Sequence, residues 1–323
     1  MDTAISLTAS AGPLTSDIPA PLDKTDRPAI SLRGVTKRYG PLTAVDNLTL
    51  EIPAGSTVAL LGQNGAGKST TVGMLTGLLE PDGGTVRVGG VTPRAAVTTG
   101  GIAAMLQDCG PMPGVTVAEL VELGRRLYPA PLATGAALEL AGLSGLARRR
   151  VERLSGGQGQ RLKFALVAVA NPDTMLLDEP TRALDVQGRR EFWAAMRAFA
   201  DSGRTILFAT HYLDEVEQNA DRVVVMAHGR IVADGTPAEI RAASGGATVR
   251  FRLPDRAAAA ASIQLDAPLL PGTVAVDGEW VTVRTDDSDA TVRALAAGPL
   301  SWRDLSVLPP SLDDSFLQLT SEE

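Results

Sequence analysis

Several features are scarce or missing in this 323-residue chain, and each shortage excludes a class of protein. Cys109 is the only cysteine, which excludes an internal disulfide and favours a reducing compartment. Lys and Arg total 30 against 37 Asp and Glu, and the net charge of −7 argues against nucleic acid as a partner. No run approaches the length of about 18 apolar residues that a membrane-spanning helix needs, and the N-terminus does not resemble a signal peptide. Any membrane role must therefore come through a partner chain.

The composition changes along the chain and divides it into three parts. Residues 1–27 are rich in Ala, Ser, Thr, Pro and Asp, and we expect a disordered tail there. Residues 28–244 alternate short apolar strands with helical segments, which predicts an α/β domain whose part from about 101 to 165 is mainly helical. Local patterns within it predict a strand at 85–88, helices at 136–146 and about 187–200, a hairpin around 227–230 and a helix with Pro237 at its first position. After a Ser-Gly-Gly linker, residues 245–323 show short strands and short helices, one of them at 256–263, which predict a small C-terminal α+β domain.

A glycine-rich loop follows the strand-like run at residues 58–61 and precedes a helical run at 70–79. It matches G-x-x-x-x-G-K-[ST] at every fixed position, the pattern of a P-loop. Its backbone N–H groups and the helix N-terminus after it suit phosphate oxygens, Lys68 can reach the β- and γ-phosphates, and the Ser69 hydroxyl can ligate Mg²⁺. The sequence therefore predicts a nucleoside triphosphate site made of Gly62, Asn64, Gly65, Ala66, Gly67, Lys68, Ser69 and Thr70.

A second helix N-terminus with glycines lies far from the first in sequence. Ser155 and Gln158 have the spacing of a capping box, and Gly156 and Gly157 stand between them. The helix that begins here offers another natural anion site. The pair Thr116 and Glu119 also has capping-box spacing, which predicts a helix start at residue 116.

Carboxylates end one buried strand, and a histidine ends another. Asp178 and Glu179 follow the apolar run 175–177, and His211 follows the β-branched run 205–210. Open α/β sheets bind ligands at the carboxyl ends of their strands, so we expect Glu179 and His211 to face the phosphates. Adjacent side chains alternate along a strand, which predicts that Asp178 serves Mg²⁺ while Glu179 serves the attacking water.

Tyr39 lies upstream of the P-loop, separated from it by a strand-like segment at residues 45–52. An aromatic ring at this position can stack on a nucleotide base, because a π-face binds any base. It can equally be a core residue, and the spacing leaves both interpretations open.

These motifs together resemble the nucleotide-binding subunit of an ATP-binding-cassette (ABC) transporter over about residues 31–243. The ordered signals are Tyr39, the P-loop, Gln107, the L-S-G-G-Q turn at 154–158, the Asp178–Glu179 pair and His211, and the pairing of P-loop with L-S-G-G-Q is highly specific. The resemblance implies a P-loop NTPase with a RecA-like core sheet, an antiparallel β subdomain and a helical subdomain. It also implies a head-to-tail homodimer, in which Ser155 and Gly157 of one subunit close on the ATP held by the other.

The same resemblance implies a role for each residue outside the P-loop. Tyr39 is similar to the aromatic residue that stacks on adenine, and Gln107 to the residue that senses Mg²⁺ and couples to the membrane subunit. Asp178 resembles the carboxylate beside Mg²⁺, Glu179 the general base for water, and His211 the switch residue on the γ-phosphate.

The segment 181–185 looks like the loop that lies between the two subunits and ends at Asp185, which we count among the ATP-binding residues. It departs from the common pattern at Ala183, where glycine is usual in the family.

Three segments, 110–120, 208–213 and 310–320, are similar to drug and antibiotic exporters of the daunorubicin-resistance type. This similarity implies a polytopic permease as partner and a peripheral location at the cytoplasmic face of a bacterial membrane. ATP hydrolysis would then power export of drugs, antibiotics or other hydrophobic compounds. The alternatives are an importer ATPase with a regulatory C-terminal domain, and a soluble non-transport ABC ATPase. Long coiled-coil heptads or a second cassette would favour the soluble class, and neither occurs.

Overall fold

The computed structural model describes residues 27–106, 112–243, 246–253, 272–298 and 300–308, and Leu312, Phe316, Leu319 and Thr320 near the C-terminus. Gln107, Cys109, nearly all of the predicted tail and a helix expected from its sequence at 256–263 lie outside these residues. The chain falls into two units: residues up to His211 together with His228–Arg230, and residues Tyr212–Ala227 together with those from Ile231 onward. In the part of the chain that the structure covers, no helix is long and apolar enough to cross a membrane.

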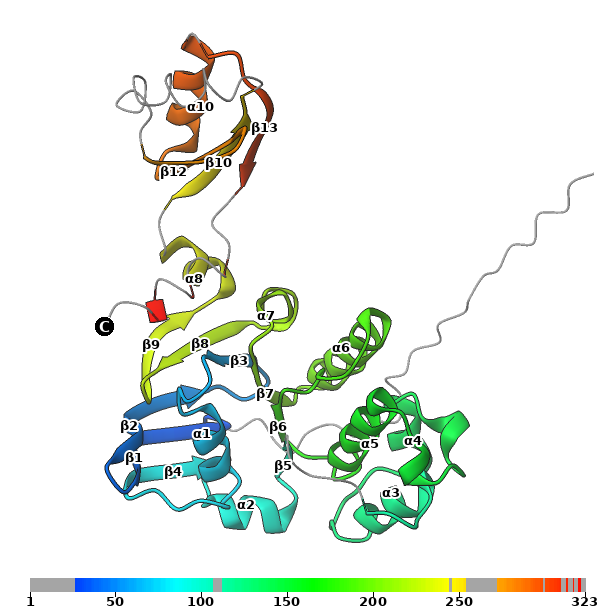
Figure 1. Ribbon diagram of the computed structural model, residues 1–323. Coiled ribbons are helices and arrows are strands. Elements are labelled where there is room, and N and C mark those ends of the chain that lie inside the picture. Colours follow the sequence, from blue (N-terminus) through cyan, green and yellow to red (C-terminus); the bar gives the residue numbers. More distant parts are fainter. Residues whose placement is uncertain are drawn as a thin grey trace, which may run out of the picture. The chain divides into compact units, whose positions relative to one another are not determined.

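An antiparallel sheet opens the first unit. Its strands are β1 (Ile30–Tyr39), β2 (Leu42–Ile52) and β4 (Gly83–Val88), in the order β2-β1-β4. Ile30, Leu32 and Val35 are fully buried along β1. The structure confirms the strands expected at 45–52 and 85–88, and the antiparallel β part of the predicted fold (Figure 1).

A parallel sheet positions the P-loop and the carboxylates. Strands β5 (Ile102–Met105), β6 (Thr174–Asp178), β7 (Thr205–Thr210) and β3 (Thr57–Gly62) run parallel in that order. Residues of β3, β6 and β7 are buried throughout, as strands covered on both faces are. Because the strands are parallel, Gly62, Asp178 and Thr210 all end at one edge of the sheet, as the sequence predicts.

The helices beside these strands match the sequence patterns unevenly. Helix α1 begins at Lys68 as predicted, but it ends at Leu75 rather than near residue 79. Helix α6 (Val186–Asp201) matches its predicted range, whereas α2 (Pro93–Thr99) was not predicted. The general α/β prediction is confirmed, and the errors lie at helix ends.

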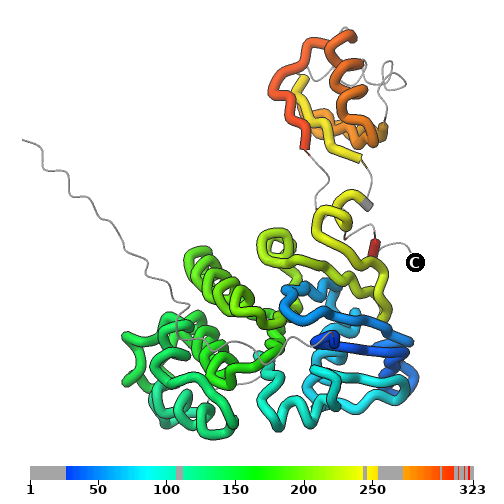
Figure 2. The backbone as a smooth tube through the Cα atoms, turned by 180° about the vertical axis from the view of Figure 1, so that it is seen from behind, coloured from blue at the N-terminus to red at the C-terminus, as the bar shows by residue number. Residues whose placement is uncertain are grey.

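Helices α3 (Val117–Arg125), α4 (Thr134–Leu140) and α5 (Gly156–Ala168) pack against one another and form the helical part of the unit. They form the green group in the tube view of Figure 2. The capping box at Thr116 and Glu119 is present in full. The expected helix over 136–146 is broken: α4 ends at Leu140, and a 3-10 turn, η1 (Ser144–Leu146), follows it. A second 3-10 turn, η2 (Val151–Arg153), precedes α5.

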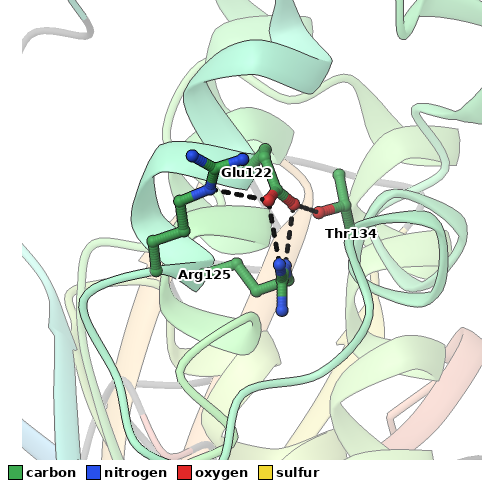
Figure 3. Close-up of polar contacts among 4 residues, drawn as sticks. Glu122, Arg125 and Thr134 are labelled. Atoms are coloured by element: carbon green, nitrogen blue, oxygen red, sulfur yellow. Dashed lines mark hydrogen bonds and ion pairs between the residues drawn. The ribbon is translucent and has the colours of Figure 1, made fainter.

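A carboxylate on α3 ties this helical part together (Figure 3). Glu122 accepts hydrogen bonds from Arg125 Nε at 2.7 Å, from Arg126 Nε at 3.0 Å and from Thr134 Oγ1 at 2.6 Å. Hydrogen bonds from Arg125, then Thr134, then Arg126 hold the pKa of the Glu122 carboxyl well below its ordinary value of 4.5. Because Thr134 begins α4, this carboxylate connects α3 to the start of α4.

The second unit contains two helices and a strand pair. Helix α7 (Leu213–Asn219) precedes strand β8 (Arg222–Ala227), and helix α8 (Pro237–Ala243) follows β9 (Arg230–Gly235). Strands β8 and β9 are neighbours in the sheet order, which confirms the hairpin predicted around residues 227–230. Pro237 stands at the first position of α8, as expected.

A small α+β domain forms the rest of this unit. Its strands β10 (Ala247–Arg252), β11 (Thr273–Asp277), β12 (Trp280–Thr285) and β13 (Arg303–Leu308) follow the order β11-β12-β10-β13. Helix α10 (Ser288–Ala297) covers one face of this sheet, where its Leu295 packs against Phe251 and Val283 (Figure 1). Strand β13 was not predicted, and its burial does not alternate along the strand.

Candidate nucleotide site

The P-loop turns from β3 into α1 and holds its lysine against its own backbone. Lys68 Nζ donates hydrogen bonds to Gly62 O at 2.7 Å and to Gln63 O at 3.1 Å. Gly67, at the N-cap of α1, has a φ of 100°, a left-handed conformation that a side chain disfavours. The loop therefore presents a helix N-terminus and a fixed cation at the sheet edge.

Charge around Lys68 is balanced by the two carboxylates at the end of β6. Burial lowers the pKa of the Lys68 ammonium group from its ordinary value of 10.5, while the charges of Glu179 and then Asp178 raise it. The side chain is 8% exposed. Because Lys68 is buried beside two carboxylates, its electrostatic interactions would change strongly when phosphates and a divalent cation bind.

Asp178 and Glu179 point to different partners. The Ser69 hydroxyl lies 3.4 Å from Asp178 Oδ2, which places the carboxylate beside the first turn of α1. Glu179 Oε1 lies 2.8 Å from His211 Nδ1, and the Glu179 side chain is 11% exposed. Of the residues that the sequence predicts here, the structure thus pairs Ser69 with Asp178 and Glu179 with His211.

One oxygen of Glu179 is buried without a partner in the part of the chain that the structure covers. Oε2 accepts no hydrogen bond, although Oε1 meets His211. A buried unpaired carboxylate oxygen is costly, so this atom calls for a water molecule or another donor.

Among the residues described, no three His, Cys, Asp or Glu side chains cluster to hold a metal on their own. The Ser69 hydroxyl and the Asp178 carboxylate, 3.4 Å apart, are oxygen donors of the kind that Mg²⁺ takes together with waters and phosphate oxygens.

A turn that sequence patterns did not connect to the site braces the P-loop. The Gly229 N–H donates to Ala66 O at 3.1 Å, and the Asp46 N–H donates to Gly229 O at 3.0 Å. Gly229 has a φ of 78°, and a Cβ there would lie 2.8 Å from Ala44 O. Only glycine fits this position. The hairpin pattern predicted the turn, but it carried no signal for its contact with the P-loop.

The L-S-G-G-Q turn begins α5 with the predicted cap. Ser155 accepts from the Gln158 N–H, and the Gln158 side chain accepts from the Ser155 N–H. A Cβ at Gly156 would lie 3.6 Å from Ala183 Cβ, and one at Gly157 would lie 3.4 Å from Ala183 O. The turn therefore lies directly against the loop that resembles the one between subunits.

That loop has a left-handed residue at the departure from the family pattern. Ala183 has a φ of 67°, the conformation that the usual glycine adopts without cost. The loop closes with a hydrogen bond from the Leu184 N–H to Thr181 O at 3.0 Å. Asp185 caps α6 by accepting from the Gly188 N–H at 2.7 Å. The loop thus holds an alanine in a left-handed conformation.

Tyr39 ends β1 and is 46% exposed, so the core interpretation of this residue is wrong. Lys37 Nζ lies 5.9 Å from the centre of its ring. An exposed ring with a cation beside it is available to a base, and its role in stacking stays a prediction.

A family model described as ABC transporter matches residues 45–182. The daunorubicin/doxorubicin resistance ATP-binding protein DrrA of Streptomyces peucetius is 40% identical over 304 residues, which cover 90% of this chain and 92% of that protein. The Nod factor export ATP-binding protein I of Paraburkholderia xenovorans is 36% identical, over 91% of this chain and 98% of that protein. Among solved structures, a dimeric ATP-binding cassette in a post-hydrolysis state with ADP and Pi matches with a TM-score of 0.59 and 25% identity, over 64% of this chain and 98% of that one.

The P-loop at the parallel sheet edge and the L-S-G-G-Q turn at the start of α5 therefore belong to an ABC ATPase. The chain belongs to the ATP-binding proteins of ABC transporters, in the exporter subfamily similar to the daunorubicin-resistance proteins. It is an ATP-binding and ATP-hydrolysing subunit that powers an exporter.

Proposed function

We propose that this chain hydrolyses Mg-ATP with Glu179 as the general base, as one half of a head-to-tail homodimer beneath a polytopic permease. The observation that carries the proposal is the Glu179 carboxylate itself. Its Oε1 is held at 2.8 Å from His211 Nδ1, its Oε2 is buried without a partner in the covered part of the chain, and its charge acts on Lys68 of the P-loop.

The triphosphate would bind to the P-loop backbone and to Lys68, which would exchange its carbonyl partners for phosphate oxygens. The ring of Tyr39 would stack on the adenine. The complete set proposed for ATP is Tyr39, Gly62, Asn64, Gly65, Ala66, Gly67, Lys68, Ser69, Thr70, Ser155, Gly156, Gly157, Gln158 and Asp185.

Ser69 and Asp178 would hold Mg²⁺, with Gln107 as a further ligand from the family resemblance. The Ser69 hydroxyl and the Asp178 carboxylate lie 3.4 Å apart at the start of α1, which brings two suitable oxygens together. When bound, Mg²⁺ neutralises charge that develops on the phosphates.

Hydrolysis then depends on what Glu179 and His211 hold in place. The carboxylate would accept the proton of a water molecule near its unpaired oxygen. His211 lies at the end of β7, orients the carboxylate through Nδ1 and would contact the γ-phosphate. Phosphoryl transfer needs positioning and charge stabilisation more than covalent participation, so two oriented side chains and a fixed cation suffice for the chain's share.

A dimer would complete each site. Ser155 and Gly157 begin α5 beside the loop 181–185, and α5 offers its N-terminus to an anion. In the head-to-tail arrangement that the family resemblance implies, this N-terminus closes on the ATP of the partner subunit. The similarity to a solved dimeric cassette supports this arrangement.

The permease would dock on the helical part, between Gln107 and Arg126. Met112 and Leu123 are 51% and 45% exposed there, and the neighbouring Leu127 is 73% exposed, so apolar side chains are available to a partner. The names of the relatives support export of drugs, antibiotics or other hydrophobic compounds, from a peripheral position at the cytoplasmic face of a bacterial membrane. We propose that residues 28–244 form the ABC domain and that residues 245–323 form an accessory domain that stabilises the complex.

A crosslinking experiment tests the partner and separates the alternatives. In a Cys109→Ser background, Met112→Cys would crosslink to a polytopic membrane protein in native membranes, whereas Val232→Cys, 41% exposed on β9, serves as the matched control. Equal crosslinking from Val232→Cys, or an active ATPase that never engages a membrane protein, would overturn the docking surface. The second outcome would favour the soluble ATPase.

A further inference from the structure

One hydrogen-bonded side chain on α5 reaches the backbone of the proposed catalytic carboxylate. Gln160 lies in the second turn of the helix that begins with the L-S-G-G-Q turn. Its Nε2 donates to Glu179 O at 3.1 Å and to Pro180 O at 2.7 Å. The side-chain amide of Gln160 therefore donates both of its protons, one to each of two successive carbonyls.

The backbone at Glu179 needs such support. Strand β6 ends at Asp178, and Glu179 adopts a φ of 50°, a left-handed conformation that L-residues with side chains rarely occupy. Its N–H donates to Ala209 O at 2.9 Å on the neighbouring strand. Its carbonyl accepts from the Arg182 N–H at 3.2 Å, which closes the turn, and from Gln160, which is the side chain that holds the turn from α5. A sparsely populated backbone conformation persists only when its surroundings fix it.

We propose that Gln160 is a positioning residue that fixes the left-handed turn at Glu179 and thereby aims its carboxylate at His211 and the reacting water. This inference rests on the proposed role of Glu179 as the base. Gln160 makes its two side-chain hydrogen bonds to backbone carbonyls. It acts through the two carbonyls and links the start of α5, which would contact one ATP, to the carboxylate that serves the other ATP.

Arg161, the next residue on α5, contacts α6 and not the turn at Glu179. Arg161 Nη2 pairs with Glu191 Oε2 at 2.6 Å, so it fixes the helix rather than the turn at Glu179. Loss of Gln160 therefore leaves α5 anchored, and its effect on rate is separable from an effect on folding.

The test is a double-mutant cycle on the full chain. Gln160→Met keeps the shape and removes both donors, Gln160→Glu keeps the shape and places a negative charge against two carbonyl oxygens, and Gln218→Met, exposed on α7, is the control. We expect Gln160→Met to lower kcat about 10- to 100-fold, the scale of a misplaced reacting group, with KM for ATP and the thermal midpoint close to wild type. We expect Gln160→Glu to be slower still, an order that a loss of packing alone would not produce.

The decisive comparison is made in a Glu179→Gln background. If Gln160 acts through the Glu179 carboxylate, Gln160→Met has little further effect on the residual rate there. An equal fold-loss in both backgrounds, or unchanged kcat in Gln160→Met, would overturn the proposal while the base role stands. Wild-type turnover in Glu179→Gln alone would instead remove the base role, so the two failures are distinguishable.

Discussion

Replacement of Glu179 by glutamine is the sharpest perturbation that the site allows. The amide keeps the length of the side chain and retains an acceptor for His211 Nδ1, now 2.8 Å from the carboxylate. It removes the proton acceptor, and it also removes one negative charge beside Lys68. We therefore expect the variant to bind Mg-ATP at least as well as wild type and to hydrolyse it slowly.

The size of the rate loss follows from the role assigned to the residue. A positioned general base contributes about 10²- to 10⁴-fold, so the barrier rises by roughly 3–5 kcal/mol. The loss does not exceed this range, because Lys68, the P-loop N–H groups and the α1 N-terminus still stabilise the transferring phosphoryl group.

The assay pairs the hydrolysis rate with sizing chromatography in Mg-ATP. With hydrolysis blocked, the ATP-bound dimer accumulates, whereas the control Glu139→Gln, exposed on α4, behaves as wild type. Wild-type turnover in Glu179→Gln would refute the base role. Slow turnover without a dimer would leave that role intact and count against the closed-dimer arrangement.

Substitutions at three further positions probe other parts of the chain. Lys68→Ala loses most ATP affinity in a titration, because the loop loses its fixed cation and charge-assisted hydrogen bonds; unchanged affinity would refute the site. Ala183→Gly raises the free energy of unfolding by up to about 1 kcal/mol, since it relieves a left-handed alanine at some cost in chain entropy, whereas Ala183→Val lowers it. The carboxyl pKa of Glu122 is lowered in the fold, so its stabilisation is complete above its ordinary value of 4.5 and is lost as pH falls toward the lowered pKa. The difference in urea midpoint between wild type and Glu122→Gln therefore shrinks from pH 7 to pH 3, and a constant difference would contradict the assignment.

Sequence patterns predicted the elements that carry strong local signals. Strand β3, the start of α1 and the two capped helices α3 and α5 follow from apolar runs, glycines and capping boxes, which act within a few residues. Helix α2 also has local signals, the N-cap Thr92, Pro93 at its first position and Gly100 at its end, and the prediction missed them. Strand β13 has no such signal and depends on pairing with β10, which is distant in sequence. The break after α4 has a local cause, because Gly142 adopts a left-handed φ of 65° and the Leu143 N–H closes the helix on Leu138 O at 2.7 Å.

The site divides in the same way. The edge of a parallel sheet collects the ends of its strands, so Asp178 and His211 could be placed near the P-loop from topology alone. The braces were not predictable. Gly229 donates to Ala66 through its backbone amide, and Gln160 donates to Glu179 through its side-chain amide. Neither separation along the chain follows a secondary-structure period, and amide groups are too common in a sequence to mark either contact.

The divergence of Asp178 and Glu179 was predicted, but for a reason that the structure corrects. Alternation along a strand was taken to turn the two side chains apart, yet β6 ends at Asp178, so Glu179 lies beyond the strand. Its left-handed backbone, with a φ of 50°, turns the side chain toward His211 instead. Strand alternation would fix the direction of Glu179 within the sheet, whereas a left-handed residue depends on whatever holds its peptide. The aim of the proposed base is therefore open to control from α5, through the carbonyls that Gln160 holds.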